Sequence, residues 1–237
     1  VSTEDDELAP TDAQERLEAL QTRGERLAEV DAELATARED RLAEGRKLSA
    51  ARTKAGSKLA DAITNEIQDL GFPHGEFRVE ITPGEAGPTG LDTVDFGFAP
   101  NVGEPLRALR AIASSGEISR VMLATKAILA DHDQIPLLVF DEIDANVGGE
   151  MGHAIGEKLM RVADTHQVIC ITHLPQVAVH GATHFVVTKA VRAGRTHTQV
   201  ASVQQDARAE EIARMLGGRD STSVALRHAR EMLQNPG

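Results

Sequence analysis

One uninterrupted stretch of helix-forming residues limits what this chain can fold into. No proline occurs between Ala13 and Leu70, and alanine, glutamate, arginine, lysine and leucine, all strong helix formers, predominate there. A helix of that length would extend for roughly 85 to 90 Å at 1.5 Å per residue, which exceeds the diameter of a compact domain. We therefore expect residues 12–70 to form a helical arm that projects from the rest of the protein.

One side of the expected arm is repeatedly apolar. A single heptad position is occupied by leucine or alanine at residues 13, 20, 27, 34, 48, 55 and 62. The companion position is poorly kept, because Gly24, Asp31 and Arg38 fall on it alongside Leu17 and Leu59. The pattern favours a coiled-coil arm whose partner helix lies elsewhere in the chain. The alternative is a long surface helix that is broken at a glycine, either residue 45 or residue 56.

The first residues differ from the arm in being acidic and without apolar periodicity. We expect residues 1–11 to be a disordered, solvated start. The segment Thr11 to Gln14 has the pattern of a capping box, so the helix is expected to begin at about residue 12. Because the first residue is Val1 and not methionine, we expect the chain to be a piece of a longer polypeptide.

Beyond residue 70 the pattern changes to alternating strands and helices, which predicts an α/β lobe over residues 71–237. Two segments of period-two hydrophobicity, around 77–81 and 94–98, predict paired strands separated by a loop over 82–90. Helices over 117–130 and 148–163 and buried strands over 136–140 and 167–172 follow. Two apolar strands flanking a crossover helix indicate parallel strands covered on both faces. A hairpin around 193–195 and helices from about 207 and 221 add an antiparallel portion and complete the lobe.

Composition narrows the class of protein. No apolar run approaches the roughly 20 residues that a membrane helix needs, so no membrane association is expected. The single cysteine, Cys170, excludes an internal disulfide and fits a reducing cytoplasm. The net charge of -12 argues against a basic surface over the whole chain, although not against a local patch. Basic residues do cluster at the expected hairpin turn, where they could contact DNA phosphates or simply be solvated: Lys189, Arg192, Arg195 and His197.

Polar residues follow both expected parallel strands. Asp141 and Glu142 end the first strand, and Thr172 and His173 end the second. Because the carboxyl ends of parallel strands meet at one edge of a sheet, these side chains are expected to lie close together. Two carboxylates and a histidine suit a magnesium nucleotide: one carboxylate for the hydrated metal, one to orient a water, and the histidine on a phosphate oxygen. Taken singly, such a histidine is more often a hydrogen-bonded structural residue.

A third element precedes these strands. Ser114, Ser115 and Gly116 stand before the helix over 117–130, so backbone N–H groups and the positive end of the helix dipole would face a phosphate there. The structural alternative is a capping box formed by Ser114 and Glu117, which any helix can use.

Four segments carry a resemblance to a known family. "SGEISRVMLA", "LVFDEIDANVGG", "CITHLPQVA" and "ARMLGG" resemble the carboxyl-terminal half of the bacterial RecN family, SMC-like proteins with ABC-type ATPase heads that act in recombinational repair of DNA double-strand breaks. The resemblance covers most of the chain, because a helical arm entering the carboxyl-terminal lobe of the head is also how that family is built. It implies ATP and Mg²⁺ as ligands.

The resemblance also implies roles for the first motif. Ser114, Ser115 and Gly116 match the signature motif, which in this family presses on the γ-phosphate of ATP held by the opposing subunit, with Glu117 closing the motif. The family usually has Gly-Gly after the serine, whereas this chain has Ser115-Gly116. A side chain therefore stands where bare backbone would approach the phosphate.

The remaining motifs match the other nucleotide-binding segments of the family. By resemblance, Asp141 would hold the hydration shell of Mg²⁺, Glu142 would polarise the attacking water, and His173 would sense the γ-phosphate. Asn146 would lie in the D-loop at the dimer interface. A P-loop requires a Gly-Lys dipeptide, which this sequence lacks. The family carries that loop in an amino-terminal lobe of the same polypeptide, so this chain would supply half of an active site.

The implied protein is a cytoplasmic, nucleoid-associated ATPase whose heads form an ATP-dependent homodimer and whose arm transmits that change to DNA. The chain alone is expected to bind ATP weakly and to hydrolyse it negligibly. The alternative function is a structural coiled-coil scaffold with a degenerate ATPase lobe, for which Ser115 is the one hint. A transporter ATPase domain fits poorly, because those domains lack a long helical arm.

Overall fold

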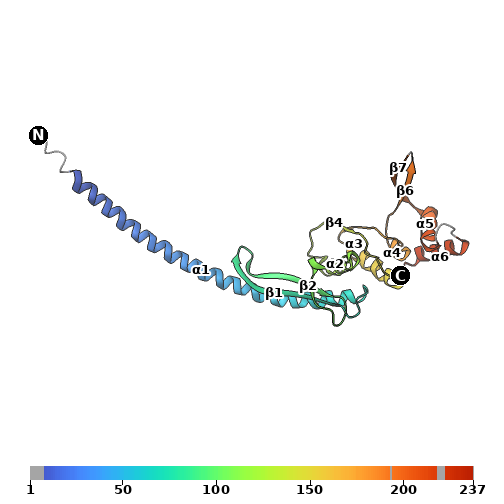
Figure 1. The fold of residues 1–237 in the computed structure, drawn as a ribbon, viewed down its shortest axis with the longest axis horizontal. Helices are drawn as coiled ribbons and strands as arrows, with labels where there is room; N and C mark the ends of the chain where they lie inside the picture. Colours follow the sequence, from blue (N-terminus) through green and yellow to red (C-terminus); the bar gives the residue numbers. More distant parts are fainter. Residues whose placement is uncertain (1–7, 193, 218–221, 237) are drawn as a thin grey trace. The chain divides into compact units, whose positions relative to one another are not determined.

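The computed structural model describes residues 8–192, 194–217 and 222–236 (Figure 1). Most of the expected acidic start, residues 1–7, lies outside the described residues, as do Ala193 in the hairpin turn and residues 218–221. The chain divides into two compact units. One comprises residues 1–55 and 81–94, and the other comprises residues 56–80 and 95–237.

The expected arm is a single helix, α1 (Leu8–Gln68), of 61 residues. It runs through Gly45 and Gly56 without a break, so the alternative of a broken helix is wrong. It also begins four residues before the expected start, because Pro10 falls in the first turn, where a helix needs no N–H donor. Leucines of the predicted apolar stripe are exposed, between 40% and 64%: Leu20, Leu27, Leu34 and Leu48. Leu17 of the companion position is 56% exposed. None of the described helices is both long and apolar enough to cross a membrane.

In the first unit, a β-hairpin packs on α1. Strands β1 (Glu76–Gly87) and β2 (Gly90–Ala99) are neighbours in one sheet and run through most of the segment expected to be a loop. The prediction of a loop over 82–90 was therefore wrong. Asp92 explains part of the extension, since its carboxylate accepts a hydrogen bond from Ser49 Oγ (2.7 Å) and lies 3.3 Å from Arg52 NH1. A Cβ on Gly45 would come within 2.5 Å of Leu91, so a glycine is needed where the hairpin meets the helix.

The second unit contains the predicted alternation of helices and strands. Helix α2 (Ser115–Leu129), strand β4 (Leu137–Phe140), helix α3 (Gly149–Ala163) and strand β5 (Gln167–Cys170) follow in order. β4 and β5 pair in parallel, with Leu138 opposite Val168, which confirms that prediction. Their buried face joins a core to which Ile63 and Ile67 at the end of α1 also belong. Other buried members of this core are Leu70, Phe72, Phe98, Val121, Leu123, Leu138, Phe140, Ile143, Ile155 and Val162.

The prediction that these parallel strands are covered on both faces is wrong for the described chain. Leu138 and Phe140 are buried, but the alternate residues are exposed: Leu137 42%, Val139 59%, Ile169 47% and Ile171 56%. Successive side chains of a strand point to opposite faces, and the core cluster lies against only one of them. We call the exposed set of four the open face of the β4–β5 sheet.

The carboxyl-terminal portion is antiparallel and helical, as expected. Strands β6 (His184–Arg192) and β7 (Arg195–Val203) form the hairpin, and helices α5 (Gln205–Gly217) and α6 (Ser223–Gln234) follow. These helices enclose a second, smaller core with Val179, Ile212, Ala213, Ala229 and Met232. Three short elements were not predicted: β3 (Arg107–Ala108), η1 (Leu109–Ala111) and α4 (Pro175–Ala178).

Candidate functional site

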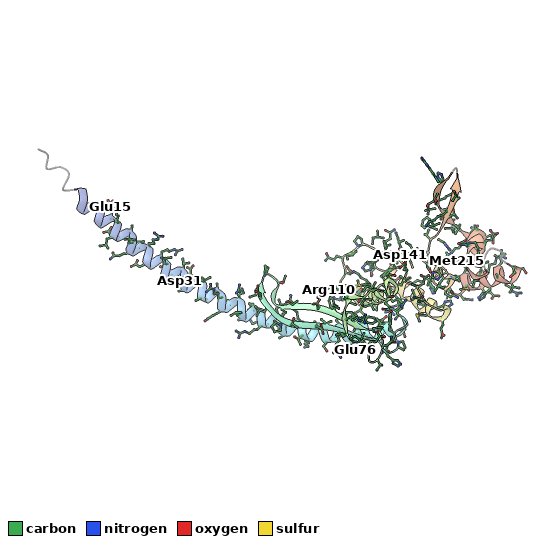
Figure 2. All side chains as sticks on the ribbon, in the orientation of Figure 1. Glu15, Asp31, Glu76, Arg110, Asp141 and Met215 are labelled. Atoms are coloured by element: carbon green, nitrogen blue, oxygen red, sulfur yellow. The ribbon has the colours of Figure 1, made fainter. Side chains whose placement is uncertain are left out.

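The two acidic residues after β4 are exposed at the end of the strand. Asp141, labelled in Figure 2, accepts the backbone N–H of Glu142 on its Oδ1 at 2.9 Å. Glu142 has a φ of 55°, a left-handed conformation that is uncommon for residues other than glycine, asparagine and aspartate. The chain therefore turns sharply here, and both carboxylates remain accessible to a ligand.

The first turn of α2 lies directly on this acidic segment. Ser115 Oγ donates a hydrogen bond to Glu142 Oε2, and Ser119 Oγ donates to the backbone carbonyl of Asp141 at 3.0 Å. Gly116 is buried between them, and a Cβ on it would lie 3.0 Å from Ala145 Cβ and 3.2 Å from the carbonyl oxygen of Glu142. A larger residue would therefore have to push the Glu142–Ala145 segment away by a few tenths of an ångström. The structure thus joins two motifs that are 27 residues apart in the sequence.

Arg120 strengthens the same contact and was missed by the sequence analysis. Its side chain is buried, and NH1 donates to the carbonyl oxygens of Ile143 (3.3 Å) and Ala145 (3.1 Å). The guanidinium also lies over the ring of Phe72, 5.0 Å from its centroid. Burial lowers the pKa of Arg120 below its ordinary value. Nothing in the local pattern "SGEISR" indicates these contacts, because the acceptors lie 23 and 25 residues further along the chain.

Ser114 caps α2. Its hydroxyl accepts the N–H of Glu117 at 3.4 Å, which is the first half of the capping box considered above. The structural role of Ser114 is therefore real. It leaves the anion role open, because several N–H groups in the first turn of a helix have no acceptor within the helix.

His173 and Asn146 lie on loops next to the acidic segment. His173 follows β5 with its side chain 72% exposed, and its Nδ1 is 3.1 Å from Oδ2 of Asp144, a residue to which the sequence analysis assigned no role. Asn146 is exposed and has a φ of 60°, a conformation that asparagine tolerates well. The N–H of Val147 bonds to the carbonyl of Asp144 at 3.2 Å, which closes a tight turn around Asn146.

The protein side chains at this site could supply only some of the ligands of a magnesium ion. Among the described residues, no group of three or more His, Cys, Asp or Glu side chains could hold a metal. The exposed carboxylates of Asp141 and Glu142 nevertheless fit Mg²⁺, which is usually bound through one or two carboxylates together with phosphate oxygens and water. The donor set therefore fits an ion that arrives with a nucleotide.

The other candidate groups are separate from this site. Lys189, Arg195 and His197 are exposed on the β6–β7 hairpin, and the side chain of Arg192 lies outside the described residues. A small cavity at the base of the hairpin is lined by residues 182–184 and 203–205 and by Arg208. It includes none of the residues expected at the nucleotide site.

Comparison with known proteins finds relatives among DNA repair proteins. No protein-family model matches the chain. The DNA repair protein RecN of Xylella fastidiosa (strain Temecula1) is 42% identical over 191 residues, covering 79% of this chain. RecN of Deinococcus radiodurans is 43% identical over 190 residues and covers 80% of the chain. RecN of Bacillus subtilis (strain 168) is 35% identical over 237 residues and covers 93%. The chain is a relative of the RecN DNA repair proteins.

The match covers only part of those proteins. The chain spans 34% of the Xylella RecN, 33% of the Deinococcus RecN and 41% of the Bacillus RecN. It corresponds to their carboxyl-terminal portion. The resemblance inferred from the four sequence segments is confirmed.

Solved structures show the same fold. The Smc head domain of Pyrococcus yayanosii, with a coiled coil and joint, matches with a TM-score of 0.53 at 20% identity, covering 84% of this chain and 36% of that one. The Smc head domain of Pyrococcus furiosus, with an extended coiled coil, matches with a TM-score of 0.51 at 18% identity, covering 80% and 45%. The expected fold class, an SMC-like head lobe with a long helix, is confirmed.

Proposed function

We propose that this chain is the carboxyl-terminal part of an ATPase that acts in recombinational repair of DNA double-strand breaks, through ATP-dependent dimerisation of its heads and ATP hydrolysis. The relationship to RecN supports the process. One structural observation supports the chemistry: the first turn of α2 is hydrogen-bonded to the exposed Asp141 and Glu142 segment. This places a helix N-terminus, which can face the triphosphate of a second head, beside two carboxylates that suit a hydrated Mg²⁺.

Each side chain then has a distinct role. Asp141 would hold the hydrated Mg²⁺, and the bound ion would supply positive charge to the phosphates. Glu142 orients and polarises the attacking water, and His173 contacts the γ-phosphate. The signature segment Ser114 to Glu117 presents its N–H groups to the triphosphate held by the second head. Asn146 lies across the interface between the two heads.

The open face of the β4–β5 sheet supports a partner lobe. Four large apolar side chains are between 42% and 59% exposed there. Contiguous apolar surface of this kind marks an interaction site. We propose that the amino-terminal P-loop lobe of the same polypeptide covers this face and supplies the phosphate cradle. Without that lobe the chain is expected to hydrolyse ATP negligibly.

DNA is the proposed macromolecular partner, and the exposed basic residues of the β6–β7 hairpin are one candidate contact. The leucine stripe of α1 is exposed for a second helix of a coiled-coil arm. Movement of that arm would transmit head closure to DNA. A cytoplasmic, nucleoid-associated location follows from this function.

The test compares the complete polypeptide with its Glu142→Gln variant. Steady-state ATP hydrolysis and size-exclusion chromatography in Mg-ATP are measured for both. We expect the parent to hydrolyse ATP, and the variant to lose hydrolysis and accumulate as an ATP-dependent dimer. Robust hydrolysis by the present chain alone would contradict the division of the site between two lobes.

A structural scaffold is the second candidate function. The observation in its favour is Ser115, whose hydroxyl occupies one oxygen of the Glu142 carboxylate at a position where the family usually has glycine. A scaffold would show neither hydrolysis nor ATP-dependent dimerisation in either protein, so the same experiment separates the two functions.

A further inference from the structure

Asp144 is a buried carboxylate at the point where the ends of β4 and β5 meet. Its side chain is only 3% exposed. One oxygen, Oδ2, accepts hydrogen bonds from the hydroxyl of Thr172 and from the backbone N–H groups of His173 (2.8 Å) and Leu174 (3.2 Å). The donors lie 28 to 30 residues further along the chain. Asp144 therefore fixes the backbone that carries His173.

The same oxygen also faces the imidazole. Nδ1 of His173 lies 3.1 Å from Asp144 Oδ2, while the side chain as a whole is 72% exposed. A carboxylate oxygen can only accept, so Nδ1 must carry a proton for the contact to be favourable. In the neutral ring this leaves Nε2 without a proton. The exposed part of the ring is thus the part that a ligand would meet.

The imidazole of His173 matters for Asp144 because few groups near this buried carboxylate can carry a positive charge. Among the described residues, His173 is the one side chain able to carry a positive charge within 4.0 Å of the Asp144 carboxylate. A buried carboxylate is costly unless several donors satisfy it. Three hydrogen bonds fulfil that need, and the imidazole is held by a group that is itself rigidly placed.

We propose that Asp144 is a positioning residue for His173: it holds the proton on Nδ1, fixes the orientation of the ring, and stabilises the imidazolium that forms when Nε2 takes a proton from solvent and donates it in a hydrogen bond to the nucleotide phosphate. Residues that orient a functional histidine through its second nitrogen act in this way at metal and hydrolytic sites. The tautomer is inferred from the 3.1 Å approach of Nδ1 to Oδ2, whereas its effect on hydrolysis rests on the function proposed above.

Asp144 also links the segment after β4, which carries Glu142 and Asn146, to the segment after β5, which carries His173. It lies between Glu142 and Asn146 in the sequence, and its carboxylate is bound to the segment after β5. A displacement of the turn at Asn146 would therefore move the carboxylate that lies 3.1 Å from the His173 ring. Glu142 and His173 are in this way coupled through one buried side chain.

The first test measures the tautomer directly. Imidazole ¹⁵N shifts of this chain are recorded at about pH 8.5, well above the ordinary histidine pKa of about 6.5, with His173→Gln used to assign the signals. We expect His173 to be protonated at Nδ1. A ring protonated at Nε2 in the unaltered chain would overturn the proposal, whatever the behaviour of any variant.

The second test uses a matched pair of variants. Asp144→Asn keeps the size of the side chain but replaces the carboxylate oxygen by a weaker, neutral acceptor, so the Nδ1–H signal should give way to the tautomer mixture of an exposed histidine. Thr172→Val removes one donor to the same oxygen and leaves both carboxylate and imidazole in place. It should destabilise the fold without changing the tautomer. Equal tautomers in all three proteins would refute the positioning role.

The third test measures hydrolysis by the complete polypeptide. Asp144→Asn should lower kcat by about ten- to a hundredfold, the range seen when the partner of a functional histidine is removed, while the KM for ATP changes little. Thr172→Val should change kcat by less than about threefold, because an uncharged donor is lost and the ring stays in place. An unchanged kcat in Asp144→Asn, with hydrolysis abolished by Glu142→Gln, overturns the catalytic part of the proposal. If Glu142→Gln has no effect, the proposed ATPase function fails and the tautomer result stands by itself.

Discussion

A buried ion pair ties α3 to the end of α1, and its two halves should respond very differently to mutation. Lys158 of α3 has a side chain only 6% exposed, and its Nζ lies 2.5 Å from Oε2 of Glu66 and 3.2 Å from Oδ2 of Asp69. Glu66 is 18% exposed and has a second cation, Arg161, at 3.5 Å. Lys158 thus depends on Glu66 more than Glu66 depends on Lys158.

The magnitudes follow from what each change leaves behind. Glu66→Gln leaves the buried ammonium with an amide and the exposed Asp69, so it should destabilise the second unit by about 3 kcal/mol, at the lower end for breaking a buried pair. Lys158→Met keeps an apolar chain of similar length, and Glu66 retains Arg161 and some water, so the expected loss is about 1 kcal/mol. Asp69→Asn removes a 69% exposed partner and should cost well under 1 kcal/mol.

Urea unfolding of the three variants measures these differences. With a slope of about 2 to 3 kcal/mol per molar urea, Glu66→Gln should lower the midpoint by about 1 M and Lys158→Met by less than about 0.5 M. A Lys158→Met variant that is as unstable as Glu66→Gln would refute the reasoning, because the attraction itself, and not the stranded ammonium, would then dominate the energy.

Three further predictions follow from the site and its surroundings. Ser115→Ala removes the hydroxyl that is hydrogen-bonded to the Glu142 carboxylate, so it should speed ATP hydrolysis by the complete polypeptide up to about tenfold. Ser115→Gly should speed it equally. If only the glycine variant is faster, the Cβ of Ser115, and not its hydroxyl, is what slows hydrolysis. Burial raises the pKa of the Cys170 thiol from 9.0 to about 12, so a thiol reagent should modify it much faster in urea than in the native chain. Because the unfolded thiol ionises first, stability should fall by about 1.4 kcal/mol per pH unit between pH 9 and 12, and Cys170→Ala should lose that slope. Burial lowers the pKa values of His180 and His184, so the unfolded chain takes up protons first and stability should fall as pH drops through about 6.5; an unfolding midpoint unchanged between about pH 7.5 and 5.5 would contradict this.

Periodicity located most of the elements, because their faces differ sharply in polarity. The strand expected over 136–140 is β4 at Leu137–Phe140, and the helix expected over 148–163 is α3 at Gly149–Ala163. A continuous apolar strand shows only that both of its faces avoid water. It does not show which chain covers them, and the open face at Val139 and Ile169 escaped the sequence analysis for that reason.

Helix and strand boundaries expected from proline and glycine were wrong in two places. In one, the position of the proline within the helix decided the boundary, and in the other, tertiary contacts did. Pro10 suggested a boundary, yet a proline in the first turn costs a helix nothing. Glycine and proline suggested a loop over 82–90, but the strands extend through most of it where Asp92 bonds to Ser49 and Arg52 of the helix beside them. In this hairpin, contacts with the neighbouring helix outweigh the low strand propensity of glycine and proline.

For the candidate site, the sequence indicated the exposed groups and missed the buried ones. Asp141, Glu142 and His173 have patterns that point to ligands. Arg120 and Asp144 have partners that are backbone groups 23 to 30 residues away, and no local pattern records such contacts. Arg120 is 7% exposed and Asp144 is 2% exposed, and only the folded structure shows that they are buried.

These two buried charges explain why the segment from Asp141 to Asn146 can hold an unusual backbone. Arg120 binds its carbonyls from the side of α2, and Asp144 binds the chain after β5, so the segment is fixed from both directions. Left-handed conformations at Glu142 and Asn146 cost free energy and persist only where the surroundings determine them. Arg120 and Asp144 are buried while Glu142 and Asn146 are exposed, so we expect a ligand that shifts the exposed residues to disturb the buried contacts as well. Under the proposal made above, ligand binding at Glu142 would then also change the position of His173.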